Sequence, residues 1–231
     1  MEPASALLDL RLQRARDLQP RPRGSDPWSL DALRGRLTEL VGGADSANIS
    51  VASRLISQAQ MAGDLGAWVA THRDVFFPPD FAAAGIDLNA LPVVWAFPPE
   101  DGARSVRRAG QERASRHARS ARVAVRAAER LLRSGAFGLI VIDLARDLSL
   151  DAASQGRLLR LAEHHDAQVL LLRRRRGDER YSGSLVGVRA QSSCRQVAPG
   201  RFRVTITNTK DKREGPGWTT SEEFDGPPGL Y

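Results

Sequence analysis

The chain of 231 residues is short of cysteine, lysine and long apolar runs, and each shortage excludes a class of protein. The single cysteine, Cys194, rules out an intrachain disulfide and suits a reducing compartment. One cysteine and four histidines without ligand spacing argue against a zinc site, so we expect no metal. Apolar runs such as FGLIVIDLA are too short to span a membrane, and the opening MEPASALLDLRLQR lacks the apolar core of a secretory signal. We therefore expect a cytoplasmic protein with no membrane partner.

Arginine supplies nearly all of the positive charge. Of the 34 basic side chains only Lys210 and Lys212 are lysines, so the other 32 are arginines, and the formal net charge is +7. A basic balance favours an anionic partner, either nucleic acid or the acidic face of another protein. With 42% hydrophobic and 26% charged residues, the chain is otherwise typical of one globular α/β domain.

The stretch LTELVGGADSANISVA resembles a phosphate-binding P-loop in its order of strand, glycine-bearing loop and helix. The P-loop pattern is Gly-x-x-x-x-Gly-Lys-Ser/Thr. With Gly42 as the first glycine, other residues stand at the later key positions: Ala47, Asn48 and Ile49. Moving the frame by one residue restores a hydroxyl at Ser50 but leaves Ile49 at the lysine position. Because no lysine precedes Lys210, no frame supplies the ammonium group that reaches the phosphates. We predict a degenerate loop and no nucleotide cofactor.

Alternating strand and helix patterns predict a mainly parallel sheet covered by helices on both faces. The expected strands are RLTELV, LGAWVAT, LPVVWAF, FGLIVID, AQVLLL, a run near residues 184–193, and RFRVTITN. The expected helices cover residues 4–17, 50–62, 103–134 and 151–165, with Gly135 as a cap for the third. We divide the chain into an amino-terminal helix and linker (1–24), a core (25–212) and a flexible tail without periodicity (213–231).

Three stretches of this core, in order along the chain, resemble the RecA recombinase. GRLTELVGGADSANISVASRLISQAQMAGDLGAWVA is similar to the RecA P-loop strand, loop, helix and next strand. AVRAAERLLRSGAFGLIVIDL is similar to the helix and strand that end in the Walker B aspartate, here Asp143, and FRVTITNTKDK to a late RecA hairpin. The resemblance covers roughly residues 25–212 and implies a RecA-like P-loop fold with a degenerate Walker A motif.

Several departures from RecA suggest a more specific group. His72 stands close to the place of the RecA catalytic glutamate, with Asp74 beyond it. The segment after Asp143 is too short to hold the first RecA DNA-binding loop, and we expect no counterpart of the RecA carboxy-terminal domain. A short RecA relative with degenerate Walker motifs resembles the ImuA group, which is related to the SulA cell-division inhibitors. This resemblance implies a non-enzymatic accessory protein of the SOS response that acts in mutagenic translesion synthesis. The implied partners are RecA, the ImuB polymerase subunit and an error-prone replicative-type polymerase, with single-stranded DNA as a further candidate and a nucleoid-associated location after DNA damage.

Three other functions compete with this interpretation. A nucleotide-driven enzyme is disfavoured by the missing lysine. A SulA-like division inhibitor would bind FtsZ and elongate cells on overexpression. A plain DNA-binding module would bind DNA tightly, with steep salt dependence, in the absence of any protein partner.

Two neighbouring features supply charged candidate site residues: the strand that ends in Asp143 and the helix before it. Asp143 has two interpretations: a magnesium-bound carboxylate, or a residue that caps the next turn or hydrogen-bonds the degenerate loop. The helix before it carries arginines at steps of three and four, which place them on one face: Arg116, Arg119, Arg122, Arg126, Arg130 and Arg133. The opposite, apolar face should pack on the sheet through Ala118, Ala121, Val125, Ala128 and Leu132. The exposed row either binds phosphates or an acidic partner, or is only a solvated face.

Further candidates lie in loops and at the chain ends. Four adjacent arginines, Arg173, Arg174, Arg175 and Arg176, follow the strand QVLLL in the place of the second RecA DNA-binding loop, and Tyr181 could stack on a base. They either contact an anionic partner or only raise solubility. At the amino end, three leucines either pack on the core or dock on RecA: Leu7, Leu8 and Leu12. In the tail, Trp218, Phe224 and Tyr231 either anchor in a partner groove or belong to a frayed end.

Overall fold

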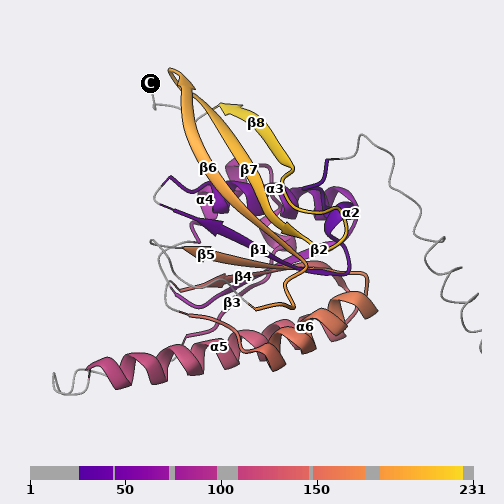
Figure 1. Ribbon diagram of the computed structural model, residues 1–231, viewed down its shortest axis with the longest axis vertical. Coiled ribbons are helices and arrows are strands. Elements are labelled where there is room, and N and C mark those ends of the chain that lie inside the picture. Colours follow the sequence, from indigo (N-terminus) through magenta and orange to yellow (C-terminus); the bar gives the residue numbers. More distant parts are fainter. Residues whose placement is uncertain are drawn as a thin grey trace, which may run out of the picture.

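The computed structural model describes residues 26–43, 45–72, 76–97, 109–145, 148–174 and 183–225, with only the helical backbone for 109–116. The described strands form one eight-stranded sheet in the order β3-β2-β4-β5-β1-β6-β7-β8 (Figure 1). Every neighbouring pair from β3 to β6 is parallel, whereas β7 is antiparallel to both β6 and β8. The mainly parallel α/β sheet predicted from the sequence is therefore confirmed.

The strands and helices have the following bounds. The strands are β1 (Arg36–Gly42), β2 (Leu65–Ala70), β3 (Val93–Trp95), β4 (Phe137–Leu144), β5 (Gln168–Arg174), β6 (Val188–Ala198), β7 (Arg201–Asp211) and β8 (Thr219–Asp225). The helices are α2 (Leu30–Leu33), α3 (Asn48–Met61), α4 (Pro78–Ala83), the 3₁₀ turn η1 (Leu88–Ala90), α5 (Ala109–Arg133) and α6 (Ala152–His164).

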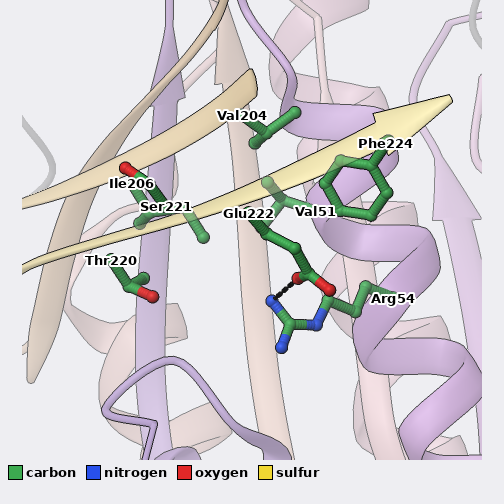
Figure 2. Close-up of a pocket in the computed structure, with 8 residues that line it drawn as sticks. All are labelled: Val51, Arg54, Val204, Ile206, Thr220, Ser221, Glu222 and Phe224. Carbon is green, nitrogen blue, oxygen red and sulfur yellow. Dashed lines mark ion pairs between the residues drawn. The ribbon is translucent and has the colours of Figure 1, made fainter. Parts of the chain in front are cut away.

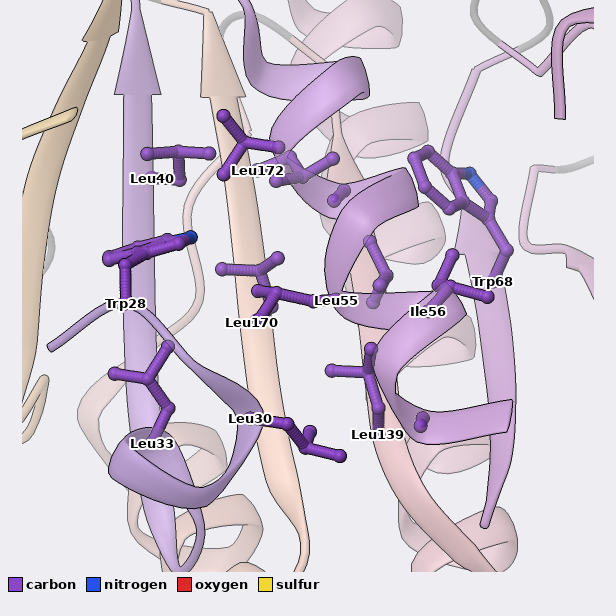
Figure 3. Close-up of a cluster of buried hydrophobic side chains, with 14 of the residues drawn as sticks. Trp28, Leu30, Leu33, Leu40, Leu55, Ile56, Trp68, Leu139, Leu170 and Leu172 are labelled. Carbon is purple, nitrogen blue, oxygen red and sulfur yellow. The ribbon is translucent and has the colours of Figure 1, made fainter. Parts of the chain in front are cut away.

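Helices cover both faces of the parallel part of the sheet, and a separate apolar core lies under each layer (Figure 1). One core lies between the sheet and α3, with α2 and α4 at its ends, and contains the fully buried Trp28, Leu55 and Trp68 (Figure 3). The other lies under α5 and α6 and contains Leu132 and Ile142. Burying one large apolar side chain contributes about 1.5–3 kcal/mol, so these two cores hold the layers together. The central strands β1, β4 and β5 are buried along nearly their whole length because helices cover both faces of the sheet.

Local sequence signals fix several helix ends. The Asp151 carboxylate accepts a hydrogen bond of 2.6 Å from the Ser154 N–H and so caps the start of α6. The pKa of Asp151 lies below its usual range because that hydrogen bond favours the charged carboxylate. At the end of α5, Gly135 adopts φ 71° and its N–H donates to the Leu132 carbonyl, which confirms the predicted cap.

The predicted tail is wrong for residues 219–225. This segment forms β8, the edge strand, which pairs antiparallel with β7 along its whole length. Its sequence, TTSEEFD, lacks a strong apolar alternation, so hydrogen bonding to β7 rather than its own burial defines the strand. Asp211 holds the turn between β7 and β8 in place. Its carboxylate accepts hydrogen bonds from the Arg213 and Glu214 N–H groups and from the Trp218 indole.

Smaller corrections concern helix bounds and one helix face. The helix after β1 begins at Asn48 rather than residue 50, whereas the predicted start of α5 at residue 103 lies outside the described residues. Ala118 is exposed instead of packing on the sheet, because the helix buries Ser120 and Ala124 at that end. Val125, Ala128 and Leu132 are buried, as predicted.

Candidate functional site

The loop that resembles a P-loop lies between β1 and α3, at the carboxyl end of the central strand (Figure 1). This is the usual position for a ligand site in an open parallel sheet. Gly42 ends β1, and the Ser46 side chain folds directly over it. A Cβ atom on Gly42 would lie 1.9 Å from the Ser46 Oγ, so only glycine fits there. The loop therefore packs its own serine against the turn.

The loop's amide groups near α3 are hydrogen-bonded to serine hydroxyls of the protein itself. The Ala47 N–H donates to the Ser192 Oγ (3.1 Å), and the Asn48 N–H donates to the Ser46 Oγ (3.2 Å). In a phosphate site such N–H groups at a helix start point at the ligand. Ala47, at the position of the second glycine, has φ −100°, so this turn does not use the left-handed backbone conformation for which glycine is chosen.

Asn48, at the lysine position of the motif, is buried and joins three strands. Its side-chain amide donates to the carbonyls of Leu40 in β1 (3.3 Å) and Arg173 in β5 (3.0 Å). Its Oδ1 accepts a hydrogen bond from the Ser192 hydroxyl of β6 (2.7 Å). At the position where a P-loop lysine would bind phosphate, Asn48 thus makes hydrogen bonds to the protein itself. Ile49 and Ser50 continue the first turn of α3.

Asp143 lies near the end of β4, with β5 between it and the loop strand. Its Oδ1 is 3.2 Å from the His72 Nε2, while its backbone carbonyl accepts hydrogen bonds from the N–H and hydroxyl of Thr71. Among the hydrogen bonds of the described residues, none joins the Asp143 carboxylate to the loop, and the following turn is held by Thr71, whose Oγ1 accepts from the Ala145 N–H. The Oδ2 atom is buried and has no hydrogen-bond partner among the described residues. Within the described residues the Asp143 side chain pairs with His72, and residues 146 and 147 of the following turn lie outside the description.

A buried charge cluster lies beside the loop on the other face of β1. Glu39 is fully buried and accepts hydrogen bonds from Arg189 Nε (2.6 Å) and Arg173 Nη1 (3.2 Å). Arg173 belongs to β5 rather than to the loop after it, and its guanidinium group is part of the folded core. The lone Glu within the apolar run RLTELV was the signal that could have predicted such a cluster, because a buried carboxylate requires a cationic partner.

Lys210 lies close to the charge cluster around Glu39. Burial lowers its pKa, and the nearby charges of Arg189 and Lys212 lower it further, whereas Glu39 opposes them. The Lys210 ammonium donates to the Ser184 carbonyl (3.2 Å). The lysine-bearing strand thus ends next to the Glu39 cluster.

The predicted arginine row lies on the outward face of α5. Arg119, Arg122, Arg126, Arg130 and Arg133 are all exposed. Arg116 lies in the part of α5 whose side chains are outside the description. Of the run of four arginines, Arg174 is exposed at the end of β5, whereas Arg175, Arg176 and Tyr181 lie outside the described residues.

Some of the remaining predicted residues lie outside the described part of the chain, and the others belong to the folded core. Leu7, Leu8, Leu12, Asp74 and Tyr231 lie outside the described residues. Trp218 and Phe224 are half-buried and pack against the core under α3, and the Trp218 ring lies 6.1 Å from that of Trp28. These two aromatic rings are therefore part of the fold.

A groove lies between α3 and the strands β7 and β8 (Figure 2). Val51, Val204 and Ile206 contribute apolar surface to it, and Arg54 forms an ion pair there with Glu222. Because this pair is neutral overall, the groove offers no evident complement to an anion. The Arg54–Glu222 pair attaches β8 to α3.

Neither membrane spans nor metal clusters are found in the described part of the chain. No described helix is both long and apolar enough to cross a membrane. Within the described ranges, no three His, Cys, Asp or Glu side chains gather in a way that could hold a metal ion. No protein-family model matches the sequence, and no curated protein matches it either.

Proposed function

We propose that this chain is a RecA-like accessory protein that works without nucleotide hydrolysis, by binding other macromolecules. The observation that carries the proposal is the state of the loop after β1. Its helix-start amides are hydrogen-bonded to Ser46 and Ser192, and Asn48 at the lysine position is tied to β1, β5 and β6. Because serine hydroxyls of the protein already accept from the Ala47 and Asn48 N–H groups, these groups are not available to bind a phosphate.

The RecA-like assignment is supported by the three stretches that carry the resemblance. The first folds as β1, a loop, α3 and β2; the second as α5 and β4, with Asp143 near the end of the strand; and the third lies in β7 of a hairpin with β6. Each stretch thus has the secondary structure that the resemblance implies. We infer further that the protein belongs with the ImuA group and serves mutagenic translesion synthesis through RecA, the ImuB subunit and the error-prone polymerase.

A thermal-shift experiment tests the loop. A ligand at a hundred times its Kd adds about 2.7 kcal/mol to stability, so a bound nucleotide would raise the melting temperature visibly. We expect no shift with ATP and Mg²⁺, and no phosphate release. Asn48→Lys should fail to create binding, because the amides remain occupied by serine hydroxyls. A saturable shift with the unmodified protein would contradict the proposal.

The partner assignment needs a separate experiment. Purified RecA, ImuB and the polymerase should be tested one at a time for co-elution with this protein in size-exclusion chromatography. Co-elution with at least one of them is expected. Failure with all three, alongside binding to FtsZ, would favour the division-inhibitor alternative.

A further inference from the structure

We propose that the outward face of α5 binds the phosphate backbone of a nucleic acid without reading its base sequence. This goes beyond the proposed function, which requires only protein partners. The candidate surface, here called the α5 arginine row, consists of Arg119, Arg122, Arg126, Arg130 and Arg133.

The opposite face of α5 packs on the sheet, and this packing orients the arginine row toward solvent. Val125, Ala128 and Leu132 are buried against the sheet and fix the rotation of the helix about its axis. Steps of three and four residues then carry all five guanidinium groups to the solvent side. In Figure 1, α5 forms the outer layer with α6 and extends beyond the sheet at its amino-terminal end. A long ligand can therefore approach the row along its length.

The positive charge of the row is not neutralised within the described part of the molecule. Glu129 is the acidic residue closest in sequence, and its carboxylate accepts from Arg157 Nε of α6 at 2.7 Å. Among the described contacts, Arg122 Nε donates to the Ala118 carbonyl one turn back, at 3.3 Å. Like charges three and four residues apart destabilise a helix, so this row opposes the stability of α5. An anion bound along the row would neutralise the arginines and remove this repulsion.

The length and chemistry of the row suit a polyphosphate. Arg119 and Arg133 are 14 residues apart, and a rise of about 1.5 Å per residue separates them by roughly 21 Å along the axis. One strand of a duplex carries a phosphate about every 3.4 Å, so the row spans several phosphates. Guanidinium groups stay charged at all relevant pH values and bind phosphate oxygens through paired hydrogen bonds.

An acidic protein surface is a poorer match. Protein interfaces have a desolvated centre built on aromatic and large apolar side chains. On the described part of α5, Val123 is the exposed large apolar side chain, at 41% of its full exposure. An arginine row with one valine resembles a backbone-binding surface rather than the centre of a protein interface.

The test is fluorescence anisotropy of the full chain with labelled oligo(dT) and with a mixed-sequence duplex, over a range of KCl concentrations. The variant combines Arg119→Gln, Arg122→Gln and Arg126→Gln. Three lost single-strand contacts should lower the logarithmic salt slope by about 2, so a fourfold rise in salt weakens the variant about 18-fold less than the wild type. The matched control combines Arg195→Gln, Arg201→Gln and Arg203→Gln, which removes the same charge from the β6–β7 hairpin and should lower the slope less.

The outcomes separate the alternatives. A lowered slope in the α5 variant, with the control close to wild type and both melting near the wild-type temperature, supports the proposal. Equal losses in both variants would show a response to net charge and overturn it. An unchanged slope, or a wild type that binds neither nucleic acid, would also overturn it; loss of RecA co-elution in the α5 variant would then assign the row to a protein partner. Because the binding assay contains no other protein, its failure leaves the proposed function to its own test.

Discussion

At the scale of single residues, the interior of this protein is organised by buried polar groups that join distant strands. Glu39 connects β1 to Arg173 of β5 and Arg189 of β6, and Asn48 connects the same three strands on the other face of the sheet. Both networks lie at the carboxyl half of β1, where a parallel sheet of this kind usually binds its ligand. These residues fix the strands relative to one another, and their hydrogen-bonding groups are paired within the protein.

The Glu39 cluster leads to a prediction about stability. Replacing Glu39 by Gln keeps the size of the side chain but leaves two arginines without their shared carboxylate. Removing one partner of a buried ion pair costs about 3–5 kcal/mol, and we expect a loss of that order in the free energy of unfolding measured with urea. Glu163→Gln, an exposed position on α6, is the control and should change stability little. A Glu39→Gln variant as stable as the wild type would show that the cluster is not important to the fold.

At the scale of elements, the edge of the sheet depends on the turn between β7 and β8. Asp211 lies at the end of β7 and pairs with the buried Arg36 of β1, while the same carboxylate holds the turn that leads into β8. Arg54 ties β8 to α3 through Glu222, and also pairs with Asp26 at the start of the described chain (3.2 Å). One ion pair, Arg54–Glu222, and the turn held by Asp211 thus attach a polar strand that has little apolar surface of its own.

The pKa of Asp211 gives this edge a pH dependence. Burial raises that pKa, but the hydrogen bonds from Arg36 and the turn amides outweigh burial, and the pKa lies below its usual range. A depressed pKa means that the carboxylate contributes stability above the unfolded-state value of about 3.9, and that this contribution is lost as the pH falls through the lower folded-state value. Asp211→Asn should therefore unfold more easily at pH 7 by about 3–5 kcal/mol and show a weaker pH dependence below pH 4.

The measurement is urea unfolding at pH 7 and at several values between pH 4 and pH 2. Glu223→Gln is a useful comparison, because that carboxylate pairs with Arg203 on the exposed surface of the same hairpin. It should have a much smaller effect at pH 7. If both variants lose the same stability, the buried pair with Arg36 is not what secures the edge.

At the scale of the whole molecule, the α/β core forms one sheet with two cores, and its proposed RecA contact lies at the amino end. Leu7, Leu8 and Leu12 precede the proline-rich stretch QPRPRGSDP, which separates them from the core in sequence. If the chain docks on RecA as proposed, the interface is heterologous, and an element of one chain can dock on the next subunit without closing a ring. A helix docked in that way would cap a RecA filament or compete with the next subunit.

Changing Leu7, Leu8 and Leu12 to Ser tests this docking. Each buried leucine contributes on the order of 1.5–3 kcal/mol to a contact before association costs, so the triple variant should lose RecA binding. Its melting temperature should stay near that of the wild type. Binding is best followed by biolayer interferometry with immobilised protein, and a marked fall in melting temperature would instead assign the leucines to the core.

The sequence by itself determined the order of strands β1 to β7 and of helices α3, α5 and α6, the basic balance of the chain and the absence of the P-loop lysine. Periodicity is a local property, so RLTELV, FGLIVID and the α5 pattern could be interpreted residue by residue. The tertiary structure alone decided that Ser192, 144 positions from Asn48, completes the loop network, and that Arg173 belongs to the Glu39 cluster. It also decided that residues 219–225 form a strand, since an edge strand is defined by the hydrogen bonds its neighbour offers. Contacts between distant segments leave no periodic signal in the chain, and they become visible only when the sheet has brought the segments together.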